Sequence, residues 1–351
     1  MNNLLKFPSI EAFKNVKRNV EWRAQFQGLD DKNEPIMDRL AKMPKIKFQG
    51  TVKLHGCNSG LIINPDNSFY CQSRERIISP QDDNYGFARF IHSLPNDVLE
   101  NLYAYFHTNN PVAIYGEWAG KGIQAGVGIN NIERSWFIFA ARIIDESDLD
   151  KEDWQDIDIL AGGGEDEVFN PNRIHVIDEF PKYEIEIDFE RADFSVERLN
   201  ELTLEVERSC PVAKQLGFEG IGEGIVWSPV KSPEQKQFNS EKFWFKVKGD
   251  KHSSSNVKKL ANVDVEKLNN ILEFIDISAN EGRLNQGWEY LKEMKHPLEV
   301  ASIGIFIKWV FNDILKEEKD VIEASGFKEK EIGGPIAKKS KQWYFSKLSK
   351  N

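Results

Sequence analysis

The spacing of apolar residues changes once along the chain, near residue 250, and this change restricts the fold more than any other feature. Between about residues 45 and 250, short runs of β-branched and aromatic residues alternate with Gly, Pro, Asn and Asp, which is typical of strands joined by turns. Examples are "IKFQGTVKLHG" (46–56), "PVAIYGEW" (111–118) and "KFWFKVKG" (242–249). After residue 252 the apolar residues follow helical spacing instead. The sequence therefore predicts an α+β domain over residues 1–250 and an all-helical domain over residues 256–351, with "HSSSN" (252–256) as the linker.

Individual helices are predicted from capping residues and apolar stripes. Ser9 precedes an apolar stripe, so it is expected to cap a first helix. Residues 85–106 predict a helix that is interrupted near Pro95. In the C-terminal domain, residues 264–275 and 297–323 carry two further helical patterns.

The net charge of −10 argues weakly against a nucleic-acid partner, but the charge is unevenly distributed. An acidic run occupies residues 145–167, and a lysine-rich run occupies residues 328–351. The sign of the whole chain therefore says little about any one surface. The sequence assigns no role to the acidic run.

Cysteine and histidine usage indicates neither disulfides nor a zinc site. The three cysteines form no C-x-x-C pair, and the six histidines show no zinc-type spacing. No apolar run approaches the roughly 20 residues of a membrane span. The N-terminus lacks the pattern of a secretory signal. We therefore expect a cytoplasmic protein with reduced thiols and no membrane partner, and we expect a monomer.

Six charged residues interrupt the β-prone runs at positions where alternation would otherwise build a sheet. Burying a charge is costly unless the charge is paired or functional. One such residue would be ordinary, but three lysines, an arginine and two glutamates near strands and glycines indicate a polyanion site between sheets. The six are Lys53, Arg74, Glu117, Glu223, Lys246 and Lys248.

In chain order, these residues fall in motifs that resemble those of the covalent nucleotidyltransferase superfamily of ligases and capping enzymes. The motifs are K-x-[HD]-G at 53–56, S-R at 73–74, G-E at 116–117, E-G-x-V at 223–226 and K-x-K at 246–248. His55, Asn58, "GEWAGKGIQ" (116–124) and "FPSIEAFKNV" (7–16) make the chain similar to the RNA ligase 2-like family of phage RNA ligases and kinetoplastid editing ligases. The resemblance covers roughly residues 1–250, and its strength lies in five motifs occurring in order.

The resemblance implies a nucleotidyltransferase (ATP-grasp-like ligase) domain of antiparallel sheets with flanking helices and the nucleotide between them. It also implies an ATP-dependent RNA ligase that uses Mg²⁺, or Mn²⁺, and forms a lysyl-adenylate. The AMP would pass to an RNA 5′-phosphate, and a 3′-OH would then displace it. Nicks in duplex or folded RNA are the expected substrates, with RNA repair as the purpose. The helical domain would grip RNA by shape and phosphate contacts.

The same resemblance assigns the nucleophile to Lys53. A lysine attacks phosphorus only as the neutral amine, and partial burial and neighbouring cations favour that form. We expect Lys246 and Lys248 to supply those cations. The other roles implied are phosphate contacts by Arg74 and Lys248, a ribose contact by Glu117, a metal contact by Glu223, a pyrophosphate contact by His55, a sealing role for Asn58, and stacking of Phe139 on adenine.

Several alternatives stay open at this point. Arg76 competes with Arg74, and Phe137 shares a strand face with Phe139. Val52 and Ala140 stand where the superfamily often has acids, so the preference for ATP over GTP is open. A DNA ligase or capping guanylyltransferase, a non-catalytic nucleic-acid-binding module, and transfer of AMP to an acceptor other than RNA are the rival functions.

Overall fold

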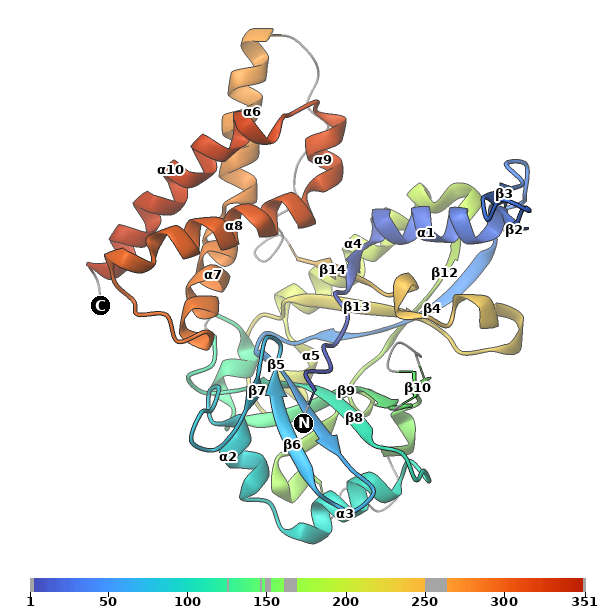
Figure 1. Ribbon diagram of the computed structural model, residues 1–351, viewed down its shortest axis with the longest axis vertical. Coiled ribbons are helices and arrows are strands. Elements are labelled where there is room, and N and C mark those ends of the chain that lie inside the picture. The colour runs from blue at the N-terminus through green and yellow to red at the C-terminus, as the bar shows by residue number, and fades with distance from the viewer. Residues whose placement is uncertain are drawn as a thin grey trace. The chain divides into compact units, whose positions relative to one another are not determined.

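The protein is described by a computed structural model over residues 3–124, 126–145, 147–148, 153–160, 169–249 and 264–349 (Figure 1). The chain divides into two compact units, Met1–Lys251 and His252–Asn351. The expected linker "HSSSN" and much of the acidic run lie outside the described residues. Among the helices that are described, none has both the length and the apolar composition of a membrane span.

A five-stranded sheet forms one layer of the first unit. Its strand order is β1-β14-β13-β4-β12, with antiparallel pairing except between β1 and β14. The strands are β1 (Glu11–Ala12), β4 (Lys45–Lys53), β12 (Tyr183–Asp188), β13 (Gly224–Pro229) and β14 (Phe245–Lys248).

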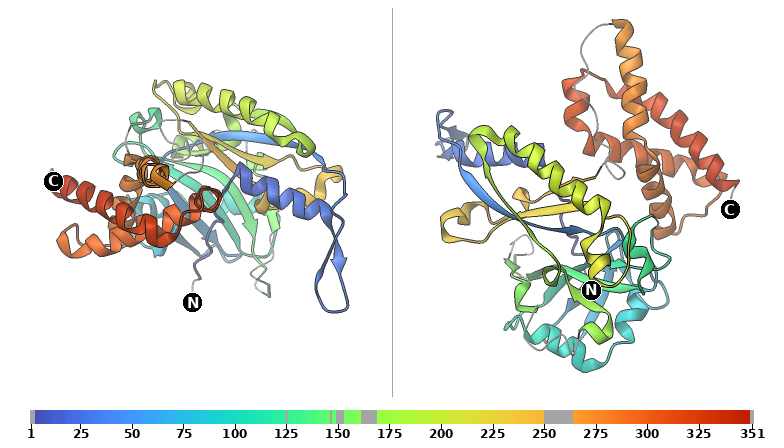
Figure 2. Two further views of the ribbon diagram at one scale, coloured as in Figure 1. Left: turned by 90° about the horizontal axis from the view of Figure 1, so that it is seen from above. Right: turned by 180° about the vertical axis from the view of Figure 1, so that it is seen from behind.

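The two faces of this sheet differ because successive side chains of a strand point to opposite sides. One face is apolar and includes Phe48, Val52 and Trp227, which join the hydrophobic core. Helices α1 (Phe13–Gln25) and α4 (Ser195–Arg208) pack beside this sheet and add their own apolar residues to the same core (Figures 1 and 2). The opposite face carries the lysines of β4 and β14.

A seven-stranded sheet forms the second layer. Its order is β10-β9-β8-β5-β6-β7, and β11 pairs in parallel with β9. Its strands are β5 (Cys57–Ile63), β6 (Phe69–Ser73), β7 (Ile77–Ile78), β8 (Val112–Ala119), β9 (Ser135–Ile143), β10 (Asp153–Gln155) and β11 (Ile174–Val176).

Helices α2 (Phe87–His92) and α3 (Asn96–Ala104) confirm the predicted interruption near Pro95. The ring of Phe90 on α2 stacks on Trp118 of β8 at 4.7 Å between centroids, so these helices cover the outer face of the seven-stranded sheet. The predicted α+β class with antiparallel sheets is therefore confirmed. The unit also contains β2 (Phe26–Leu29), β3 (Pro35–Met37) and α5 (Pro211–Gln215).

The expected cap at Ser9 is wrong. Helix α1 begins at Phe13, its N-cap position is Ala12, and no side chain caps it. Ser9 lies in an extended segment, where its hydroxyl accepts a hydrogen bond from Arg74. The two residues before the helix, Glu11 and Ala12, pair instead with β14.

In the second unit, the described residues 264–349 form helices, as predicted. The two expected stretches correspond to α6 and, for 297–323, to α8 and α9 separated at Glu318. The core of this unit includes Trp288, Phe306 and Tyr344, whereas Leu272 of the expected apolar stripe is exposed. The helices are α6 (Asp264–Ser278), α7 (Glu281–Glu293), α8 (Ile303–Glu317), α9 (Lys319–Ala324) and α10 (Glu329–Leu348).

Candidate active site

The motif Lys53-Leu54-His55-Gly56 is the connection between the two sheets. Lys53 is the last residue of β4, and β5 begins at Cys57. The Gly56 N–H donates to Glu117 Oε1 at 2.8 Å. A Cβ at Gly56 would lie 2.5 Å from the carbonyl oxygen of Trp118, so only glycine allows the connection to approach β8 this closely.

Glu223 is the centre of a cluster of basic groups. Its Oε2 accepts from Lys53 Nζ at 2.7 Å and lies 3.2 Å from His55 Nδ1. Its Oε1 lies 3.0 Å from Lys248 Nζ. The structure therefore brings together four of the predicted residues, from β4, from the connection to β5, from the residue before β13, and from β14.

Strand register explains why these side chains meet. Gly224 pairs directly with Lys53 on one side and with Lys248 on the other. The backbone of Gly224 has φ +158°, and a Cβ there would lie 2.1 Å from the carbonyl oxygen of Val247. Glycine at position 224 allows β4 and β14 to approach β13 closely, so that Lys53 and Lys248 lie on either side of Glu223.

The electrostatics of the cluster follow from this arrangement. Burial alone would raise the pKa of Glu223, but Lys53, Lys248 and His55 together hold it well below its usual value. The carboxylate is therefore ionised at neutral pH. The sequence predicted a cationic neighbour for Lys53, and the structure places Glu223 between Lys53 and Lys248, with an ion pair to each.

Glu117 lies beside this cluster on the seven-stranded sheet. Burial raises its pKa, and the nearby charge of Glu223 adds to that effect, while Lys53 partly offsets it. Glu117 pairs directly with Asn58 of β5, so both side chains lie on the same face. That face continues the site from the lysine strand onto the second sheet.

Arg74 and Arg76 have different surroundings. Arg76 donates to Asp82 Oδ1 at 2.7 Å and to the carbonyl oxygens of Asp82 and Asp83, which ties down a loop. Arg74 is half exposed and donates to Ser9 Oγ at 3.0 Å. This environment favours Arg74 as the arginine available to a ligand.

Lys246 shares a face with Lys248, since the two are separated by one residue of β14. It pairs with Val226, which in turn pairs with Thr51 of β4. Lys246 therefore lies one row of the sheet away from Lys53.

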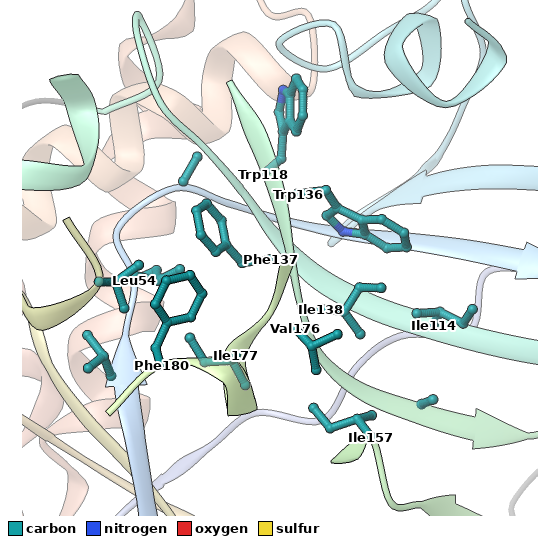
Figure 3. Packing of buried hydrophobic residues seen from close by; sticks show 14 of the residues in the cluster. Leu54, Ile114, Trp118, Trp136, Phe137, Ile138, Ile157, Val176, Ile177 and Phe180 are labelled. Carbon is teal, nitrogen blue, oxygen red and sulfur yellow. The ribbon is translucent and has the colours of Figure 1, made fainter. Parts of the chain in front are cut away.

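The two candidate aromatic residues of β9 also differ. Phe137 is fully buried, stacks on His175 at 5.0 Å, and packs near Leu54 and Phe180 (Figure 3). Phe139 is only partly buried and lies at a register shift between β8 and β9. Partial exposure leaves Phe139 able to contact a ligand, which Phe137 is not.

Val52 and Ala140, which stand where the superfamily often has acids, are both core residues. Val52 is 3% exposed and lies on the apolar face of the five-stranded sheet. Ala140 is 5% exposed and packs in a smaller core cluster with Leu5, Phe7 and Tyr115. Neither position offers a polar side chain to a base.

Phe7 and Ser9 touch the site, although the sequence analysis assigned them no role there. Phe7 packs on Phe139, and Ser9 binds Arg74. In the sequence, the stretch "FPSIEAFKNV" contributed only to the family resemblance and indicated no contact with the site.

Comparisons with known proteins place the chain in a family. The family profile described as RNA ligase matches residues 46–248, which is more than half of the chain. The comparison with curated protein sequences gives no match.

Among solved structures, the chain is similar to several of the Naegleria gruberi RNA ligase. A variant with AMP and Mn matches at 15% identity and TM-score 0.42, covering 72% of this chain and 58% of that chain. A variant with ATP and Mn matches at 17% identity and TM-score 0.41, covering 71% and 59%. The enzyme with PPi matches at 17% identity and TM-score 0.40, covering 72% and 59%. The chain therefore spans less than two thirds of the length of these relatives.

Proposed function

The chain belongs to the RNA ligase family, and from this premise we propose that it is an ATP-dependent RNA ligase acting through a lysyl-adenylate at Lys53. The observation that carries the proposal is the cluster around Glu223, in which Lys53, Lys248 and His55 converge on one buried carboxylate. Two lysines on one buried carboxylate, with His55 beside them, form a basic site that suits the phosphates of a nucleotide.

In the first step, Lys53 loses a proton to solvent and its Nζ attacks the α-phosphorus of ATP. A P–N bond forms, the bond from that phosphorus to the bridging oxygen breaks, and pyrophosphate leaves. Displacement of the Glu223–Lys53 ion pair by the incoming phosphates would free the amine for attack. Positioning and charge stabilisation supply most of the catalysis in such a transfer.

The remaining residues of the site would bind the nucleotide. Arg74, Lys246 and Lys248 would contact the phosphates, and His55 would lie near the departing pyrophosphate. On the seven-stranded sheet, Glu117 would bind a ribose hydroxyl and Phe139 would stack on the base. Val52 and Ala140 offer no polar side chain, so recognition of adenine would depend on this stack and on backbone groups.

A divalent cation fits the donor set of this site. Mg²⁺ in nucleotide sites is held by one or two carboxylates together with substrate phosphates, and Glu223 is an ionised, buried carboxylate beside Lys53. When bound, Mg²⁺ or Mn²⁺ would neutralise charge on the phosphate oxygens. Solved structures of the Naegleria gruberi RNA ligase hold ATP with Mn, and we propose the same pair here.

The later steps would use RNA ends. An oxygen of an RNA 5′-phosphate attacks the adenylate phosphorus, the P–N bond breaks, and Lys53 recovers its proton. A 3′-OH then loses its proton to solvent and attacks the phosphorus of the 5′-phosphate; the bond from that phosphorus to the bridging oxygen breaks, AMP leaves, and a phosphodiester forms. Asn58 would act in this sealing step, and a nick in duplex or folded RNA is the substrate we propose.

The helical unit would bind the RNA. The exposed lysines of α10, among them Lys338 and Lys341, lie near one another on its surface, whereas Lys339 is paired with Asp276. Exposed lysines of this kind contact phosphates without reading sequence. Lys338→Ala with Lys341→Ala should weaken RNA binding and its salt dependence while leaving self-labelling intact.

Self-labelling tests the proposal directly. The purified protein, freed of bound AMP, is incubated with Mg²⁺ and ATP labelled at the α-phosphate, and in parallel with labelled GTP, then run on a denaturing gel. Acid-labile label from ATP supports the lysyl-adenylate. Lys53→Ala should abolish the label, and Lys47→Ala, an exposed lysine of the same strand, should retain it.

Each other outcome counts against the proposal. Label that persists in Lys53→Ala would contradict the assigned nucleophile. Label from GTP alone would point to capping chemistry. No label from either nucleotide on folded protein would favour a non-catalytic binding module.

A further inference from the structure

The segment around Leu5, near the start of the described residues, is hydrogen-bonded to the seven-stranded sheet. The Leu5 N–H donates to Gln72 Oε1 at 3.0 Å, and Gln72 Nε2 donates back to the Leu5 carbonyl at 2.6 Å. The hydroxyl of Tyr115 donates to the same carbonyl at 3.0 Å. Gln72 and Tyr115 are buried, so these bonds fix the segment to β6 and β8.

A few residues later, the same segment pairs with the five-stranded sheet. Glu11 and Ala12 form the edge strand β1 of the five-stranded sheet, where they pair in parallel with Phe245 and Lys246 of β14. In Figure 1 this dark blue stretch runs from the region of the N label up to α1, passing β14. Residues 5–12, the N-terminal strap, therefore connect the two sheets that carry the proposed nucleotide site.

Between its two ends the strap contacts three residues of that site. The ring of Phe7 meets Phe139 edge-on, with centroids 4.9 Å apart and an interplanar angle of 66°. Ser9 Oγ accepts from Arg74, as described above, and Ala12 pairs with Lys246. Three contacts within six residues place the strap against the base, phosphate and lysine parts of the site.

Phe7 is held in place from several sides. Its centroid lies 5.3 Å from Tyr115, 5.6 Å from Trp154 and 6.0 Å from Trp244. Phe7 is 8% exposed. A ring confined in this way restricts the orientation of the Phe139 ring that it touches, because edge-on aromatic pairs have a preferred geometry.

We propose that the N-terminal strap orients the nucleotide site, with Phe7 as the positioning residue that sets the plane of Phe139 against the base. This inference rests on the proposed function, since it concerns how the same site holds ATP. Val52 and Ala140 offer no polar side chain to the base. The stack on Phe139 would therefore carry a larger share of base recognition in this chain, and the orientation of that ring would matter more. Ser9 has a parallel role toward Arg74.

The test measures the KM for ATP and the maximum rate of self-labelling separately, together with the ratio of labelling by ATP to labelling by GTP. Phe7→Leu keeps an apolar side chain but removes the flat ring. We expect the KM for ATP to rise about three- to tenfold, the scale of one aromatic pair. The maximum rate should stay near that of the wild type, and the ratio of ATP to GTP labelling should fall.

Phe169→Leu is the matched control. Phe169 is fully buried and meets Tyr105 edge-on at 6.0 Å, on elements that carry none of the proposed site residues. Loss of packing energy is comparable in the two variants, so a purely structural role for Phe7 predicts the same kinetics for both. An altered KM in Phe7→Leu alone supports the proposal.

Ser9→Ala keeps the test decisive if Phe7→Leu fails to fold. It removes one hydroxyl and no packing, and we expect the KM for ATP to rise about two- to fivefold from the lost hydrogen bond to Arg74. Wild-type KM and wild-type ATP preference in the folded variants would overturn the strap proposal while leaving the ligase proposal intact. Absence of labelling in the wild type itself would remove both.

Discussion

The two units each contain a buried ion cluster, and the clusters have opposite composition. In the first unit a single carboxylate, Glu223, is surrounded by Lys53, Lys248 and His55. In the helical unit a single guanidinium, Arg283, lies between Asp313 at 2.8 Å and Glu318 at 3.1 Å. In one cluster basic groups surround an acid, and in the other acids surround a base.

Exposure separates the two clusters further. The side chains of Lys53 and Lys248 are 23% and 21% exposed, whereas those of Arg283 and Glu318 are 4% and 0% exposed. Water and ligands reach the lysines but not the guanidinium. The cluster around Glu223 is therefore open to the exchange of a partner for a phosphate that we propose, whereas the cluster around Arg283 joins α7 to the α8–α9 corner.

Arg283→Leu should produce the largest effect, and it should appear in stability. Removing one member of a buried ion cluster leaves its partners charged without compensation, which costs about 3–5 kcal/mol. We expect the free energy of unfolding of the helical unit to fall by that amount in urea titrations, while self-labelling is largely retained. Lys292→Ala, which removes an exposed pair with Glu289, should change stability by less than about 1 kcal/mol. Equal effects of the two substitutions would contradict the structural role given to Arg283.

Glu223→Gln should have the next largest effect, and it should appear in the rate. The amide keeps the shape of the side chain but removes the charge that pairs with both lysines and that we propose as a metal ligand. We expect self-labelling to slow by about a hundredfold, the usual scale for removing one organising polar group. Because the pKa of Glu223 is held well below its ordinary value, the group is ionised throughout the neutral range where the assay is run.

Glu201→Gln is the control for that experiment. Glu201 is an exposed glutamate of α4 paired with Arg198 three residues earlier. Its substitution should leave the labelling rate unchanged. A labelling rate in Glu223→Gln close to that of the wild type would mean that this cluster, like the one around Arg283, is structural.

Local sequence patterns predicted some elements of the fold and not others. The strands and the helices near Pro95 were predicted because alternation and breakers act over a few residues. Pairing of Glu11 and Ala12 with β14 was missed because it joins segments more than 200 residues apart. Local propensity carries no information about such a partner.

The second unit was predicted as helical throughout, but α7 and α10 were not outlined individually, and each contains residues that usually break helices. Gly287 lies inside α7, where a Cβ would be 2.9 Å from the Trp309 ring and 3.0 Å from the Phe306 ring. Close helix packing therefore requires glycine there, against its helix propensity. Helix α10 includes Gly333, Gly334 and Pro335 and buries Ile332 and Ile336 in the core of the unit.

The meeting of Lys53, Glu223 and Lys248 could be predicted as a group but not in its geometry. Charged residues placed in apolar strands indicate a shared site, because the fold must pair or use them. The position of the carboxylate between the two lysines depends on the register of three strands, and Lys53 of β4 lies 170 residues before Glu223. The contributions of Phe7 and Ser9 depend on the same kind of long-range contact.

His175 is a partly buried polar group, against which the two ion clusters can be compared. Its Nδ1 lies 2.7 Å from Asn170 Oδ1, and its ring stacks on Phe137. Burial lowers its pKa from 6.5 to about 4. The folded protein therefore keeps this imidazole neutral where the unfolded chain would protonate it.

The smallest predicted effect follows from this difference in protonation. The unfolded chain binds a proton near pH 6.5 and the folded protein only near pH 4, so the free energy of unfolding decreases as the pH falls through that window. At pH 5 the contribution of His175 should be about 2 kcal/mol lower than at pH 8. His175→Gln keeps a hydrogen-bonding side chain but cannot titrate, so its stability relative to the wild type should rise by that amount between pH 8 and pH 5 in urea titrations. His107→Asn, at an exposed turn, should follow the wild-type curve. If the stabilities of His175→Gln and the wild type change in parallel with pH, burial does not keep this imidazole neutral. That result would contradict the argument that exposure decides the role of each of these polar groups.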